Sequence, residues 1–201
     1  MTLLTPPIPE LATRNHRRFS VEEYRRMAET GILSEDDNVE LLEGWIVEKM
    51  TKGARHDYTI QATDNAIRSR LEPNWGVRIQ SAIVLADSEP EPDLAVILNP
   101  PARYVDRHPS RDDIALLVEV AESSLAQDRG IKLRIYARSN IEVYWIVNLI
   151  EDVIEVHWDP SGPVDLPTYR GRRVFRSGES VPLAIGGQQL QPVEVKQILG
   201  R

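Results

Sequence analysis

The segment from Ile114 to Val120 constrains the possible fold more than any other part of the sequence. All of its residues are apolar except Glu119, and several are β-branched. A short run of this kind is typical of a central strand that is covered on both faces of a sheet. The chain must therefore supply further elements on each side of this strand, and it must accommodate a carboxylate within it.

The flanking sequence carries helix and strand signals in turn. A capping box of Ser20 and Glu23 predicts a helix that ends near residue 29, and a second one, of Ser124 and Gln127, predicts a helix to about residue 138. Apolar periodicity and turn residues predict the other elements: two short strands around a turn at Glu43-Gly44, a helix over 54–71, strands over 77–80, 82–85 and 94–98, a hairpin of 142–147 with 153–158, a strand pair within 170–176 and a closing helix over 193–199.

The order of these elements favours one α/β domain. Residues 114–147 form a strand–helix–strand unit, which favours a mixed sheet flanked by helices. The 201 residues suffice for a single domain. We expect this domain to begin at residue 19, after a flexible arm of residues 1–18.

Composition excludes several classes of protein. The chain has no cysteine, which excludes disulfide frameworks, thiolate nucleophiles and cysteine-bound zinc and fits a cytoplasmic location. Its apolar runs are far shorter than the roughly 20 residues that span a bilayer, so we expect no membrane segment. The net charge of −7 argues against a protein that coats nucleic acid by bulk charge. Motifs of phosphate-binding loops, dinucleotide folds, serine hydrolases and zinc proteases are absent as well.

Two carboxylates in apolar surroundings are the strongest candidates for chemistry. Asp93 directly precedes the strand over 94–98, and Glu119 lies near the end of the central strand. If these strands are antiparallel neighbours, the two side chains meet. Adjacent buried carboxylates repel each other, and a divalent cation would remove this repulsion by binding both at about 2.0–2.6 Å. The alternative is that each carboxylate meets solvent or an arginine at a strand end.

Lys132 is the third candidate. It lies on the helix that follows the Glu119 strand, at the border of the apolar face. From there its ammonium group can reach the end of the strand and stabilise an attacking water or the charge that develops on a phosphate. The alternative is an ordinary surface pair with Asp128, four residues earlier, worth only about a few tenths of a kcal/mol.

Several short motifs, taken together and in order, resemble the Uma-type putative restriction endonucleases of the PD-(D/E)XK nuclease superfamily. The resemblance covers roughly residues 19–158 and rests on Val39–Gly44, Arg55-His56, Pro92-Asp93-Leu94, Val118–Ser124, Asp128–Lys132, Tyr136-Ala137 and Glu142–Val147. It implies a restriction-endonuclease-like fold, with a central mixed sheet flanked by helices. It also implies metal-dependent hydrolysis of phosphodiester bonds, with DNA as the expected substrate.

The resemblance further implies a set of site residues. Asp93 and Glu119 would bind the metal together with the backbone carbonyl of Val120, and Mg²⁺ or Mn²⁺ is the expected ion. The superfamily pattern has a lysine two residues after the second acid, where this chain has Ala121. Lys132 matches the helix position to which this family has moved that lysine.

Glu40 and His56 complete the candidate site. Glu40 matches an early glutamate of the family and would add a third carboxylate or orient a water, the alternative being an ion pair at a strand edge. His56 precedes Ile60 by four residues, so we expect it to face the sheet. There it either contacts the phosphate or a water, or is a hydrogen-bonded core histidine. Tyr136 would donate a hydrogen bond near Lys132 or belong to the core.

The sequence is also compatible with a second function. Ala121 in place of the lysine and the acidic net charge also fit a nucleic-acid-binding or assembly module that keeps the nuclease fold without cutting. The strands that carry Trp145 and Trp158 would then pair across the axis of a homodimer. Hydrolysis of another phosphoester is a third alternative. Contacts to base edges cannot be located in the sequence, so no target site follows from it.

Overall fold

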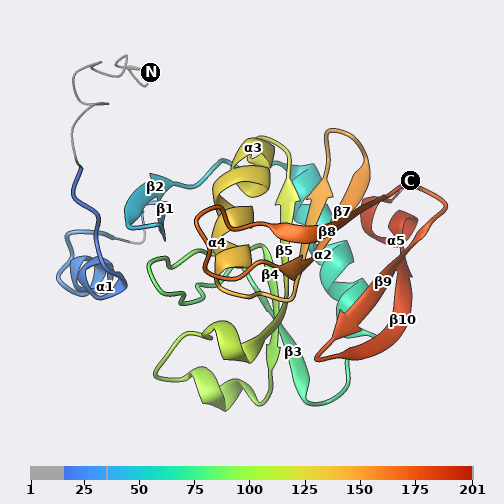
Figure 1. Cartoon of the computed structure of the whole chain (residues 1–201), viewed down its shortest axis with the longest axis horizontal. Coiled ribbons are helices and arrows are strands. Elements are labelled where there is room, and N and C mark those ends of the chain that lie inside the picture. The colour runs from blue at the N-terminus through green and yellow to red at the C-terminus, as the bar shows by residue number, and fades with distance from the viewer. Residues whose placement is uncertain (1–15, 35, 201) are drawn as a thin grey trace.

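A six-stranded mixed sheet forms the centre of the computed structural model, which describes residues 16–34 and 36–200 (Figure 1). In order across the sheet, the strands are β3 (Trp75–Ile79), β4 (Leu94–Leu98), β5 (Ile114–Ala121), β6 (Val143–Asn148), β7 (Val153–Pro160) and β8 (Tyr169–Phe175). β5 and β6 are parallel, and the other neighbours are antiparallel. The predicted α/β fold with a mixed sheet is confirmed.

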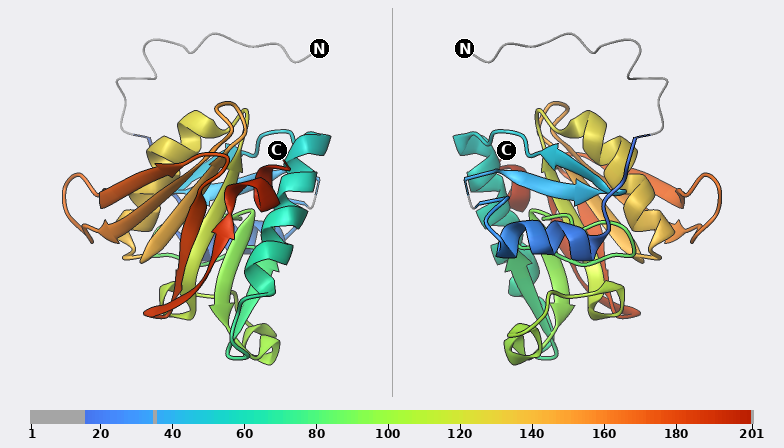
Figure 2. Two further views of the ribbon diagram at one scale, coloured as in Figure 1. Left: turned by 90° about the vertical axis from the view of Figure 1, so that its right-hand side faces the viewer. Right: turned by 90° about the vertical axis from the view of Figure 1, so that its left-hand side faces the viewer.

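Both faces of the sheet are covered, as the sequence of β5 requires. Strand β5 is buried along its whole length. Leu116 and Val118 point into one core, which is completed by α2 (Ala54–Arg68), β9 (Ser180–Ile185), β10 (Gln188–Glu194) and α5 (Val195–Leu199). Leu117 and Ala121 point into a second core, which is completed by α4 (Leu133–Arg138) and the hairpin of β1 (Val39–Leu42) and β2 (Trp45–Glu48). Figure 2 shows the sheet between α2 on one face and the helix that contains α4 on the other.

The N-terminal elements follow the predicted capping and turn chemistry. Helix α1 (Val21–Glu29) begins with the capping box, in which the amide of Glu23 donates to the Ser20 hydroxyl at 3.1 Å and the amide of Ser20 donates to the Glu23 carboxylate at 3.0 Å. The β1–β2 turn has positive φ at both Glu43 and Gly44, as a type I′ turn requires. Most of the predicted arm, residues 1–15, lies outside the described residues.

One helical stretch follows β5 and covers its face. It consists of α3 (Leu125–Gln127), the π-helical segment η3 (Asp128–Lys132) and α4, and it ends at the predicted residue. The predicted capping box at its start is wrong, because the Ser124 hydroxyl donates to Asp128 at 2.6 Å and the side chain of Gln127 donates to Glu40 at 3.1 Å. The wider π turn changes which residues face the sheet. Lys132 is therefore buried inside the helix face and not at its border.

Three further elements differ from the sequence prediction. Residues 82–85 form an isolated bridge through Val84 instead of a strand, because Pro90 and Pro92 in the following segment have no N–H to donate to a ladder. Residues 170–176 contribute to one strand, β8, and not to a strand pair. The β9–β10 hairpin was not predicted, and its second strand takes the first residues of the expected closing helix. None of the described helices is long and apolar enough to cross a membrane.

Candidate active site

The register of two strands brings the predicted acids together. β4 and β5 are antiparallel, and Leu94 pairs with Val118, so Asp93 and Glu119 lie side by side. The amide of Val120 donates to Asp93 Oδ2 at 2.9 Å, and the amide of Asp93 donates to Glu119 Oε2 over a longer 3.4 Å. Both side chains are buried.

The helix over this face holds the carboxylate of Glu119 by one of its oxygens. Lys132 Nζ donates to Glu119 Oε1 at 3.0 Å, and the Tyr136 hydroxyl donates to the same oxygen at 2.7 Å. Both strong donors use Oε1, and among the residues that the structure describes the other oxygen, Oε2, has only the long contact with the Asp93 amide. Oε2 therefore has capacity for a ligand.

The carboxylate of Asp93 is held in the same one-sided way. Its Oδ2 accepts from the Val120 amide and lies 3.1 Å from His56 Nε2. Its Oδ1 has longer contacts, 3.4 Å from the side-chain amide of Gln80 and 3.5 Å from Lys52 Nζ. Of the two acids on the adjacent strands, Asp93 thus offers Oδ1 to a ligand and Glu119 offers Oε2.

Glu40 shares the ammonium group of Lys132. Its Oε1 lies 3.3 Å from Lys132 Nζ and accepts from Gln127 at 3.1 Å, and its Oε2 accepts from the amide of Glu91 at 3.1 Å. Glu40 is buried in spite of its charge. The expected ion pair exists, and it lies within the site.

A small pocket opens onto these groups. Its volume of about 50 Å³ is room for a small ion and a few water molecules. The sheet, the covering helix, the β2–α2 loop and the start of α2 line it, with contributions from Glu40, Lys49, Met50, Thr51, Lys52, Gly53, His56, Glu91, Asp93, Glu119, Glu122, Ser123, Ser124, Gln127, Asp128 and Lys132.

The charges in the pocket are predominantly negative and poorly solvated. Burial raises the pKa of Glu119, against the pull of Lys132 and with the help of neighbouring acids such as Asp128. Burial also raises the pKa of Asp128. Burial by itself would lower the pKa of Lys132, but the surrounding carboxylates, Glu119 first and then Glu40, outweigh it and raise that pKa. The pocket is therefore an environment that favours an added cation.

His56 and Asp93 stabilise each other's charged form. Burial by itself would lower the pKa of His56, but its hydrogen bond to Asp93 and the charge of that carboxylate raise it. Burial would raise the pKa of Asp93, and the contact with His56 together with the Val120 amide lowers it instead. Asp93 is thus ionised at neutral pH.

The five side chains that the sequence singled out therefore meet at one pocket. The surface-pair alternative for Asp128 and Lys132 is wrong, because both residues are buried. Asp128 is a member of the pocket that sequence reasoning missed. It is 1% exposed, and its Oδ1 is buried and accepts no hydrogen bond from the described residues. The available signal was its spacing, four and eight residues before Lys132 and Tyr136.

The structure also shows where Ala121 and the strands with Trp145 and Trp158 lie. Ala121 is fully buried against the covering helix, and Lys132 reaches Glu119 from that helix instead. The expectation that strands with Trp145 and Trp158 pair across a dimer axis is wrong, because β6 and β7 are interior strands of the sheet and Trp145 is fully buried.

Comparison with known sequences and structures identifies the family. Residues 21–193 match the family Uma2, described as putative restriction endonuclease. The chain belongs to this family. A crystal structure of a putative nuclease belonging to DUF820 from Anabaena variabilis is similar to this Uma2 protein, with 15% identity and a TM-score of 0.65 over 90% of this chain and 98% of that one. A search of curated proteins finds no match. The expected family and nuclease fold are confirmed, and at the level of the family the Uma2 protein is placed with nucleases.

The pocket of this Uma2 protein fits a small divalent cation. Among the described residues, no three histidine, aspartate or glutamate side chains are grouped to hold a metal ion by themselves. Mg²⁺ needs fewer side chains, because it usually keeps several waters and takes one or two carboxylates. Two available carboxylate oxygens from adjacent strands, in an acidic pocket with space for water, meet that requirement.

Proposed function

We propose that this Uma2 protein is a divalent-metal-dependent nuclease that hydrolyses phosphodiester bonds in DNA. One observation carries the proposal: Asp93 and Glu119 lie side by side at the pocket, and the ammonium group of Lys132 is 3.0 Å from Glu119. Family membership supports nuclease chemistry, and the acidity of the pocket supports a cation.

In this proposal, Asp93 and Glu119 would hold Mg²⁺ or Mn²⁺ together with the backbone carbonyl of Val120. When bound, the cation would polarise the phosphate and stabilise charge on the leaving oxygen. Its two carboxylate ligands need a fixed orientation, and His56 supplies it for Asp93 through the contact with Oδ2.

Lys132 has two roles in the proposed site. Together with Tyr136 it fixes Glu119 by Oε1. Its ammonium group also faces the pocket, where it would hold the attacking water and stabilise charge that develops on the phosphate. Glu40 keeps that ammonium group in place through its own contact of 3.3 Å.

Cleavage assays with matched variants test the proposal. The purified protein is incubated with supercoiled plasmid and with single-stranded DNA, in Mg²⁺ and in Mn²⁺. We expect cleavage by the wild type and its loss in Asp93→Asn and Glu119→Gln, with folding verified by circular dichroism. Asp112→Asn is the control, because the side chain of Asp112 is 87% exposed, and it should cleave like the wild type.

Metal binding is tested separately by thermal unfolding. A ligand present at 100 times its Kd stabilises by about 2.7 kcal/mol, which for a chain of this size raises Tm by roughly 5–10 °C. We expect this increase with Mn²⁺ in the wild type and not in Asp93→Asn. An equal increase in Asp93→Asn would remove that residue from the metal site.

A wild type that binds DNA but cleaves neither substrate with either metal would overturn the nuclease proposal and favour the non-cleaving module. Homodimer formation and a cytoplasmic location stay predictions of the sequence. Gel filtration with light scattering tests the first of these.

A further inference from the structure

One cationic side chain at the pocket takes no part in the chemistry proposed above. Lys52 lies in the loop between β2 and α2 and lines the pocket. Its Nζ is 3.5 Å from Asp93 Oδ1, the oxygen that we assign to the cation. The contact is long for a charge-assisted hydrogen bond, and 37% of the Lys52 side chain is exposed. The ammonium group can therefore move without the loss of a strong bond.

The other two lysines of the pocket are held more tightly. Lys132 is buried and donates to Glu119 at 3.0 Å. Lys49 Nζ donates to Glu91 at 2.7 Å. Among the lysines that line the pocket, Lys52 is thus the one whose ammonium group is available for a new partner.

A cation at Asp93 Oδ1 changes the position of lowest energy for Lys52. The two positive charges would compete for one oxygen, and their repulsion would drive the flexible lysine stem toward the pocket mouth. Helix α2 begins there, since Gly53 lines the pocket as its N-cap and supplies no side-chain cap. The first turn of α2 adds positive potential to the same rim. An anion at the mouth would therefore meet Lys52 and the start of α2 together.

We propose that Lys52 is a phosphate-binding residue, which leaves Asp93 when the cation binds and then contacts a non-bridging oxygen of the substrate phosphate. The inference rests on the proposed function, because it takes the cation and the phosphodiester from it. It assigns the buried carboxylates to the cation, and Lys52 with the start of α2 to the phosphate, although the carboxylate of Glu122 also lies near Gly53.

The variant Lys52→Ala tests both halves of this inference. Mn²⁺ affinity, measured by titration calorimetry, should increase by about three- to tenfold, because a competing charge a few ångströms away is removed. DNA affinity should decrease, measured by fluorescence anisotropy of a labelled oligonucleotide in Ca²⁺, which takes the same oxygen ligands. The slope of log K against log salt should become smaller by about 0.9 for duplex or about 0.7 for single-stranded DNA.

Two further variants serve as controls. Lys52→Arg keeps the charge and should retain the wild-type salt slope. Lys196→Ala removes a lysine on α5 whose side chain is 66% exposed, and it should change neither the Mn²⁺ affinity nor the salt slope.

Opposite changes in the two affinities are the deciding result. A purely structural ion pair between Lys52 and Asp93 would instead lower Tm in Lys52→Ala and leave the salt slope unchanged, which overturns the inference even if the wild type cleaves DNA. Unchanged Mn²⁺ affinity overturns the displacement of Lys52 by the cation. A wild type that does not cleave, combined with the expected changes in Lys52→Ala, overturns the proposed nuclease and supports Lys52 as a phosphate-binding residue.

Discussion

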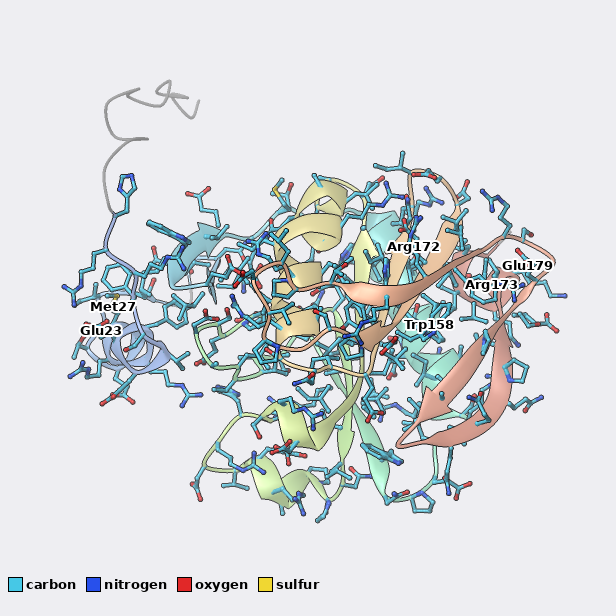
Figure 3. All side chains as sticks on the ribbon, viewed as in Figure 1. Glu23, Met27, Trp158, Arg172, Arg173 and Glu179 are labelled. Atoms are coloured by element: carbon cyan, nitrogen blue, oxygen red, sulfur yellow. The ribbon has the colours of Figure 1, made fainter. Side chains whose placement is uncertain are left out.

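Glu155, on β7, is a fully buried carboxylate that two arginines and an amide hold in place. Arg129 Nε donates to it at 3.0 Å, Arg172 Nη2 at 2.8 Å and Asn148 Nδ2 at 3.2 Å. Arg172, which Figure 3 labels, lies on β8. Arg129 belongs to the π-helical segment, so Glu155 ties that segment to the sheet. The substitution Glu155→Gln keeps the shape and removes the charge.

The loss of stability in Glu155→Gln can be calculated from the burial of Glu155 and the exposure of its arginine partners. Hydrogen bonds to a charged group contribute about 1.5–3 kcal/mol each, and breaking a fully buried ion pair costs about 3–5 kcal/mol. The side chains of Arg129 and Arg172 are 36% and 51% exposed, so solvent screens part of the interaction. We therefore expect a loss of about 2–3 kcal/mol at neutral pH, or a fall in Tm of roughly 4–12 °C.

The pH dependence has a definite sign. Burial would raise the pKa of Glu155, but nearby His157, 3.8 Å away, and the hydrogen bonds from Arg129 and Arg172 outweigh it and hold that pKa well below its usual range. A lowered folded-state pKa gives stability that is present above the unfolded pKa of about 4.3 and is lost as pH falls toward the folded value. The difference between wild type and Glu155→Gln should be constant between about pH 6 and about pH 8 and shrink below about pH 4.5.

Urea unfolding followed by tryptophan fluorescence measures this difference at each pH. Asp159→Asn is the matched control, because Asp159 pairs with Arg170 across β7 and β8 at 3.0 Å while both side chains are more than half exposed. Its effect should stay within about 0.5 kcal/mol. A Glu155→Gln variant as stable as the wild type at pH 7, or a difference that grows toward acid, would refute the assigned role of the buried carboxylate.

Three other substitutions have clear expected outcomes. Lys132→Met leaves Glu119 buried without its counter-charge, so the free energy of unfolding in urea should fall by about 3–5 kcal/mol. The loss should be larger at about pH 8 than at about pH 5, and a loss independent of pH would contradict this. Tyr136→Phe removes one hydrogen-bond donor to Glu119 and should lower the rate of DNA cleavage about tenfold while Tm changes little. An unchanged cleavage rate would show that this donor is dispensable. Gly171→Ala places a Cβ 2.2 Å from the Trp158 ring and should cost about 1–3 kcal/mol, which Trp158→Ala in the same chain should largely restore.

The sequence was sufficient to predict the part of the site that lies on the sheet. The apolar run of β5 and the run that follows Asp93 each specify a strand, and hydrophobic patterning constrains their register. Once the two strands are antiparallel neighbours, Asp93 and Glu119 have to meet. The type I′ turn at Glu43-Gly44 similarly positions Glu40 on the strand before it.

The remaining differences come from features that periodicity does not encode. The π turn alters the helix face by one residue position, so a regular period placed Lys132 at the border and left Asp128 on the surface. Strand β9 contains Pro182, which weakens a strand prediction. The sequence signals for the hairpin were the apolar residues at every second position, Val181, Leu183 and Ile185, and the Gly-Gly pair that follows them. In the structure these three residues are buried, and Gly186 and Gly187 both have positive φ.

The buried carboxylate of Glu119 makes the stability of the fold depend on pH, and this dependence tests whether the carboxylate is there to bind a cation. Glu119 lies between Leu117 and Ala121 on an apolar face, and burial there raises its pKa in spite of the nearby Lys132. A raised folded-state pKa means that ionised Glu119 lowers stability, and increasingly so as pH rises above the unfolded value of about 4.3. In EDTA, the stability of Glu119→Gln relative to the wild type should therefore increase from about pH 6 to about pH 8. Saturating Mn²⁺ should stabilise the wild type and not Glu119→Gln, because only the wild type gains the free energy of metal binding. A wild type whose stability in EDTA rises relative to Glu119→Gln as pH increases would mean that the ionised carboxylate of Glu119 stabilises the fold, and such a carboxylate needs no cation to explain it.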